Sequence, residues 1–148
     1  MRKRLIKILD YKERQWLFKA IFRMIISDKN VAKEEVDDLL ESLKLVAGKE
    51  IVDITEISKS PEFLKPLKPL KGIDYHHAFI ILTEVVRVAA IDSKIVLEEE
   101  ELLKEILALL DFDETALTKV MEWARRLAIV NREENELKKE LREDYQSH

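Results

Sequence analysis

The sequence contains no cysteine and very few turn-forming residues, with two glycines and three prolines among 148 residues. Without cysteine the chain can form neither a disulfide nor a thiolate metal site, and the cytoplasm is the default compartment. β-Sandwiches and barrels need many turn residues, so this scarcity predicts helices joined by short connections. The length and the 47% apolar content fit one domain that covers residues 1–148.

Long uncharged apolar runs are also missing. No window of the length that crosses a bilayer is free of charged residues, so we expect a soluble protein without a span. The N-terminus begins with Arg2, Lys3 and Arg4, like a signal peptide, but charges from Lys7 to Arg14 interrupt the apolar segment that should follow. Residues 2–12 could lie on an anionic membrane surface, although we favour the first turns of a core helix.

Net charge is −4, and it is unevenly distributed. Residues 1–29 carry nine basic and three acidic side chains, whereas residues 98–122 carry nine acidic and two basic ones. The basic stretch lacks the interleaved aromatic residues on which bases stack. The pattern therefore favours docking of one end of the domain on the other, and we expect no nucleic-acid partner.

Two strongly apolar segments, 16–26 and 78–91, predict central buried helices. Each precedes an amphipathic segment, 34–46 and 98–110, with apolar residues at helical spacing. An ungapped alignment of 22–39 with 86–103 contains five identities, which indicates a duplicated helix hairpin. We expect an all-α bundle of about six or seven helices with pseudo-two-fold symmetry, whose halves cover about 16–47 and 76–111.

The halves are joined by a segment that ends in LKPLKPLKG, residues 64–72. Two prolines forbid a continuous helix there, and three residues per turn would align the leucines on one edge and the lysines on another. We expect a strap with its leucines on the core, the alternative being a Pro-rich ligand for another protein. Asp113 is a candidate N-cap for a last helix, and residues 132–148 are expected to form an exposed extension.

A short motif occurs after both apolar segments: DKNVAKEE from Asp28 to Glu35, and DSKIVLEE from Asp92 to Glu99. With its flanking helices, this motif resembles the TerB-like (tellurite-resistance TerB) family over about residues 16–126. The resemblance implies a helical, pseudo-symmetric module linked to metal-ion or chemical-stress responses. It also implies candidate metal ligands at the two turns, which are Asp28, Glu34, Glu35, Asp92, Glu98 and Glu99.

Chemistry leaves two interpretations of these acids open. Carboxylates at a tight turn suit Ca²⁺, Mg²⁺ or Mn²⁺, although two or three per turn would bind weakly. The same side chains are also ordinary caps, because a glutamate at the third helical position can accept the N-cap N–H. Arg23 and Arg87, shortly before each aspartate, could pair with these acids.

No arrangement of catalytic residues is recognisable, and adjacent His76 and His77 would point in different directions on a helix. We therefore expect a non-enzymatic, cytoplasmic TerB-like module that binds a protein partner, with weak divalent-cation binding as an option. The alternative is a purely structural or peripheral membrane adaptor without metal. The oligomeric state is left open.

Overall fold

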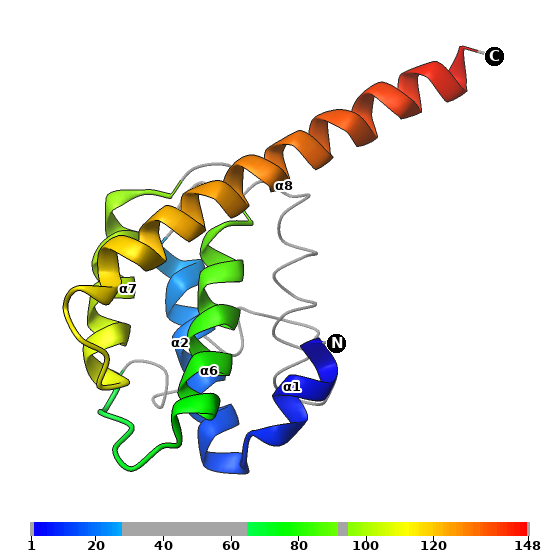
Figure 1. Ribbon diagram of the computed structural model, residues 1–148. Coiled ribbons are helices and arrows are strands. Elements are labelled where there is room, and N and C mark those ends of the chain that lie inside the picture. Colours follow the sequence, from blue (N-terminus) through cyan, green and yellow to red (C-terminus); the bar gives the residue numbers. More distant parts are fainter. Residues whose placement is uncertain (1, 28–64, 92–94, 148) are drawn as a thin grey trace.

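The computed structural model describes residues 2–27, 65–91 and 95–147. These residues form five α-helices and no strand, as Figure 1 shows: α1 Arg2–Ile8, α2 Tyr11–Ser27, α6 Tyr75–Ala89, α7 Leu97–Leu109 and α8 Ala116–Gln146. The all-helical class is thus confirmed for the described part. The predicted helix 34–46 lies outside the described residues, so the expected helix number and the duplication stay predictions.

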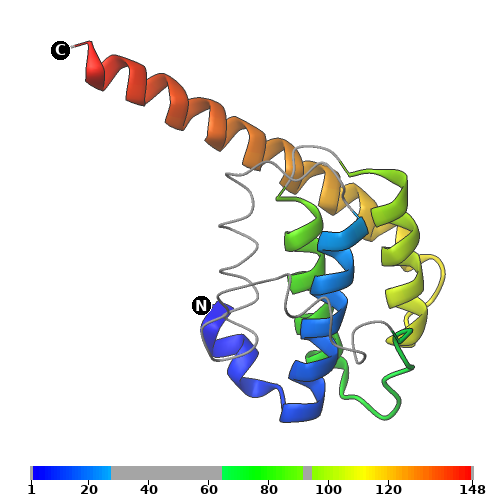
Figure 2. The ribbon, with the colours of Figure 1, turned by 180° about the vertical axis from the view of Figure 1, so that it is seen from behind.

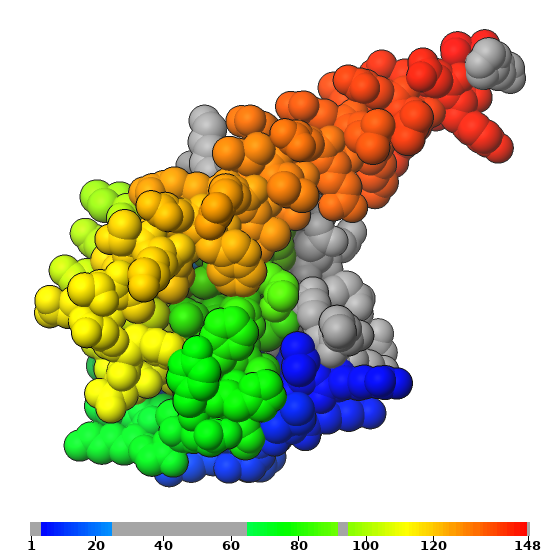
Figure 3. Space-filling view, viewed as in Figure 1, coloured from blue at the N-terminus to red at the C-terminus, as the bar shows by residue number. Residues whose placement is uncertain are grey.

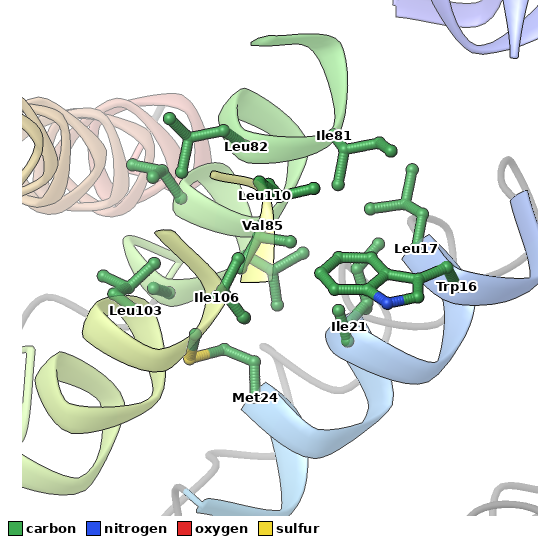
Figure 4. Packing of buried hydrophobic residues seen from close by; sticks show 14 of the residues in the cluster. Trp16, Leu17, Ile21, Met24, Ile81, Leu82, Val85, Leu103, Ile106 and Leu110 are labelled. Carbon is green, nitrogen blue, oxygen red and sulfur yellow. The ribbon is translucent and has the colours of Figure 1, made fainter. Parts of the chain in front are cut away.

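The two predicted central helices, α2 and α6, lie side by side in the middle of the molecule (Figures 1 and 2). Both are apolar around most of their circumference, and such helices need covering on several sides. Leu17 and Ile21 of α2 and Ile81 and Val85 of α6 are fully buried. Figure 4 shows these side chains gathered in one cluster, which Ile106 of α7 also joins. This cluster is the core of the described fold.

Helix α7 ends in a turn that reverses the chain toward α8. Phe112 donates its backbone N–H to the carbonyl of Leu107 at 2.9 Å, and Asp111 donates to that of Ala108 at 3.1 Å. This is the Schellman pattern, with Asp111 in the left-handed position at φ 66°. An N-cap at Asp113 predicts a helix that begins directly after it, but α8 begins at Ala116. Asp113 instead belongs to a preceding turn, in which its side chain accepts the N–H of Thr115 at 3.2 Å and its carbonyl accepts that of Ala116 at 2.9 Å.

The N-terminal half of α8 packs on the body through small residues. Ala124 and Ala128 are buried, and small side chains let helices approach closely. Asn131 adds a polar contact, since its Nδ2 donates to the carbonyl of Ala90 at the end of α6 at 2.9 Å. Beyond this point α8 continues as one helix that projects from the other described helices (Figures 1 and 2), and residues 132–147 are exposed.

The strap predicted from the leucine and lysine repeat is confirmed for residues 65–72. Leu67 and Leu70 are buried, whereas Lys65, Lys68 and Lys71 are exposed. Its backbone carbonyls accept hydrogen bonds from side chains of α2. Trp16 Nε1 donates to Lys68 O at 2.7 Å, Lys19 Nζ to Pro66 O at 3.4 Å, and Arg23 Nη2 to Lys65 O at 2.9 Å. The strap therefore belongs to this fold and covers α2.

Helix α1 uses its apolar face in the core, since Ile6 and the following Leu9 are 2% and 3% exposed. That agrees with the core-helix interpretation of residues 2–12, although Ile8 remains 46% exposed. No described helix has both the length and the apolar character needed to cross a bilayer.

Candidate functional site

The acidic turns lie only partly within the described residues. Asp28, Glu34, Glu35 and Asp92 fall outside them, and Glu98 is exposed on α7. Glu99 is 2% exposed, and its Oε1 accepts the backbone N–H of Val96 at 3.1 Å. Glu99 therefore caps α7 at the third helical position. Within 2–27, 65–91 and 95–147, no group of three His, Asp or Glu side chains is placed to hold a metal ion.

The two arginines that precede the turns have other contacts. Arg23 donates to the strap carbonyl of Lys65. Arg87 lies 3.4 Å from the buried carboxylate of Glu84, and its guanidinium carbon is 5.9 Å from the ring centre of Trp123. Arg87 thus forms an ion pair within α6 and links α6 to α8 through the cation–π contact alone.

The adjacent histidines have different surroundings. His77 Nδ1 lies 3.0 Å from both carboxylate oxygens of Glu13, a residue that is only 7% exposed. Glu13 Oε1 also accepts the backbone N–H of Asp10, and Asp10 Oδ1 accepts that of Glu13, so the carboxylate caps α2 as well. His76 is exposed, and its ring centre is 6.5 Å from that of His77. The contact between Glu13 and His77 joins α2 to α6 and is therefore structural.

An apolar groove lies between α1, α6 and α8, with a volume of about 480 Å³. Figure 3 shows this face, where α6 (green) is exposed between α8 (orange) and α1 (blue). Its apolar lining comes from three distant parts of the chain: Leu5, Phe79, Ile80, Leu82, Val120 and Trp123. Phe79 is 47% exposed, so a large part of its aromatic side chain contributes apolar surface to the groove.

The titratable side chains among the described residues that line the groove are basic. His76, Arg87 and Lys119 line it, and no acidic side chain of the described residues does. Thr83 also lines the groove, but its hydroxyl donates to the carbonyl of Ile80 in its own helix at 3.0 Å. The floor is therefore apolar and the edge carries positive charge.

Aromatic side chains extend this face toward the start of α6. The Tyr75 ring centre is 6.3 Å from that of Phe79 and 6.3 Å from that of Phe112. Tyr75 and Phe112 also line a second cavity of about 640 Å³, between the strap and the end of α7. Neither site was predicted from the sequence. Phe79 stands out in the sequence as the aromatic residue of the apolar segment 78–91. No local pattern, however, links it to Leu5 or Trp123.

Comparison with known proteins adds no relative: no family model, no curated protein and no solved structure matches the chain.

Proposed function

We propose that this chain is a non-catalytic helical binding module of the TerB-like type, whose binding surface is the groove between α1, α6 and α8. Its partner is an amphipathic helix with apolar anchors and acidic flanks. The observation that carries the proposal is the exposed Phe79 in an apolar groove that also contains Trp123. Such grooves take helices whose apolar residues recur every three or four positions.

The charge of the groove supports an acidic partner. Arg87 and Lys119 flank the apolar lining, and a partner carboxylate near them would gain a favourable contact. Arg87 is already held against Glu84 and Trp123, so little side-chain entropy remains to be lost on binding. Among the described residues that line the groove, the charged side chains are basic, and this disfavours cationic ligands for the same electrostatic reason.

The test uses a fluorescent model peptide with leucines at helical spacing and glutamates on both flanks. We expect its anisotropy to rise on titration with the protein. A control peptide of the same composition, with the leucines spread around the helix, should bind at least about tenfold more weakly because it presents no apolar face.

Two surface variants make the test specific for the groove. Phe79→Asp puts a charge on the groove lining and should weaken peptide binding, whereas Ile129→Asp should not. Ile129 is a matched control, since it is 44% exposed, like Phe79, but lies outside the groove. Equal binding of the two peptides, or an unchanged affinity of Phe79→Asp, would remove the proposal.

Weak binding of Ca²⁺, Mg²⁺ or Mn²⁺ at the two acidic turns is a separate part of the proposal, supported by the carboxylates of the repeated motif. Isothermal titration should show heat that the double variant Asp28→Asn, Asp92→Asn loses. Absence of heat at millimolar ion would end the metal proposal and leave the groove proposal untouched.

A further inference from the structure

Helix α8 carries an apolar stripe that continues beyond the groove. The stripe follows heptad-like spacing and consists of Val120, Trp123, Leu127, Val130, Leu137 and Leu141. Its first three members are half-buried beside the body. The last three are 54%, 54% and 57% exposed, on the part of α8 that projects from the other described helices (Figures 1 and 2). The face that borders the groove is thus the face left exposed along the projecting part.

Charged residues flank this stripe every seven positions. Lys119 and Arg126 occupy the flanking position in the first half of α8, and Glu133 and Glu140 occupy the same position in the second half. All four are exposed. The sign of the charge therefore changes once, near the midpoint between Ile129 and Val130.

The flanking charges of one α8 helix are complementary to those of a second, antiparallel α8 helix. In an antiparallel pair of helices, residues at equal distances from the midpoint, on the same flank, lie next to each other. Lys119 then meets Glu140 of a second copy, and Arg126 meets Glu133 of a second copy. Two-fold symmetry makes each contact twice. A parallel pair would instead bring only Glu133 close to a basic residue, Lys138 of the other helix.

We propose that two copies of this chain associate through their α8 helices, antiparallel, with the projecting part of each α8 lying in the groove of the other. This names the partner of the groove described above, and it rests on the proposed function. Leu137 of the second copy then lies close to Val120 and Trp123, and Glu134 of the second copy comes near Arg87. Glu134 occupies the position between Val130 and Leu137 where the spacing of the stripe calls for an apolar residue, and it thereby gains a basic partner.

The length of α8 is sufficient for such an interface. Its 31 residues extend over about 46 Å at 1.5 Å per residue. Pairing along this length buries the three exposed members of the stripe in each copy, and it covers Phe79 in both grooves.

The first test is the mass of the full chain in solution, measured by sedimentation over a concentration series. We expect the wild type to approach twice the monomer mass of 17.4 kDa as concentration rises. Glu133→Lys with Glu140→Lys makes all four flanking charges positive, and Lys119→Glu with Arg126→Glu makes all four negative. Each double variant alone should dimerise at least about tenfold more weakly because like charges then face each other.

The decisive measurement mixes the two double variants. Their flanking charges are opposite, so the mixture should form a heterodimer about as tightly as the wild type forms its dimer. A variant that had merely lost its fold could not be restored by mixing. A monomeric wild type at the highest concentration would overturn the proposal, and so would homodimers of both variants as stable as that of the wild type.

Disulfide cross-linking tests the antiparallel orientation. Because the sequence contains no cysteine, any disulfide that forms must come from the introduced residue. Val130→Cys lies next to the midpoint and should form an intermolecular disulfide under oxidation. Leu141→Cys should not, because its counterpart would lie more than about 30 Å away along the helices. Efficient cross-linking at both positions would indicate a parallel pair and overturn the proposal.

The two proposals fail in different ways. If the wild type is monomeric while the acidic model peptide still binds in a Phe79-dependent manner, self-association is wrong and the helix-binding groove remains. If Phe79→Asp changes neither peptide binding nor the monomer–dimer equilibrium, the groove itself is not a binding site, and both proposals are lost.

Discussion

The indole Nε1 of Trp16 donates a hydrogen bond of 2.7 Å to the backbone carbonyl of Lys68. This bond joins α2 to a strap that has no regular backbone hydrogen-bond pattern of its own. Lys19 and Arg23, one and two turns further along α2, bind the preceding carbonyls of the same strap. An extended segment on a buried surface needs such donors, because unpaired carbonyls there are costly.

Replacing Trp16 by phenylalanine removes the donor and keeps an aromatic ring. We expect the free energy of unfolding to fall by about 1–3 kcal/mol, since the Lys68 carbonyl loses its partner and the core loses volume. Urea denaturation measures this change. Lys68→Ala is the control, because only the backbone of Lys68 takes part, and its effect should stay within about 0.5 kcal/mol. Equal effects of the two substitutions would contradict the role assigned to the indole.

The contact between Glu13 and His77 predicts energetic coupling across 64 positions of the chain. Each of Glu13→Ala and His77→Ala removes the contact between the two side chains. We therefore expect a double-mutant cycle to give a coupling energy of about 0.5–3 kcal/mol. His76→Ala, which removes the exposed neighbour, should show none with Glu13→Ala. A coupling energy of zero for His77 would mean that the contact contributes nothing to stability.

Local patterns allowed the central helices, the strap and the Glu99 cap to be predicted, because these depend on residues close together in the chain. The leucines and lysines of 65–72 needed only the three-residue repeat to be placed correctly. The second half was predicted to begin at about residue 76, which is close to Tyr75, where α6 begins.

The contacts that define the groove could not be predicted in this way. Leu5, Phe79 and Trp123 come together only because α1 and α8 both pack near α6. The Glu13–His77 contact likewise depends on the register of α2 against α6. The capping role of Glu99, one of the candidate metal ligands, could be proposed from the sequence as an alternative, because a cap depends on residues only three positions apart.

The cap formed by Glu99 predicts a difference between two neighbouring acids. Glu99→Ala should lower the free energy of unfolding by about 0.5–2 kcal/mol in metal-free buffer, because the Val96 N–H loses its acceptor. Glu98→Ala should change it by less than about 0.5 kcal/mol, since Glu98 is exposed. Thermal unfolding with a chelator present measures both. Equal, small effects would show that the cap is energetically unimportant.

The turn after α7 offers a stabilising substitution. Asp111 has φ 66°, a conformation that costs an L side chain free energy and costs glycine none. Asp111→Gly should therefore raise the free energy of unfolding by up to about 1 kcal/mol, even though glycine also gives the unfolded chain more freedom. Gly72, at φ 75°, provides the reverse control. A Cβ at Gly72 would meet nothing within 4 Å, so the destabilisation expected for Gly72→Ala, about 1 kcal/mol, has only a backbone cause. If Asp111→Gly destabilises the protein instead, the Asp111 carboxylate makes a contribution larger than the backbone strain, and chemical denaturation of both variants decides between the two.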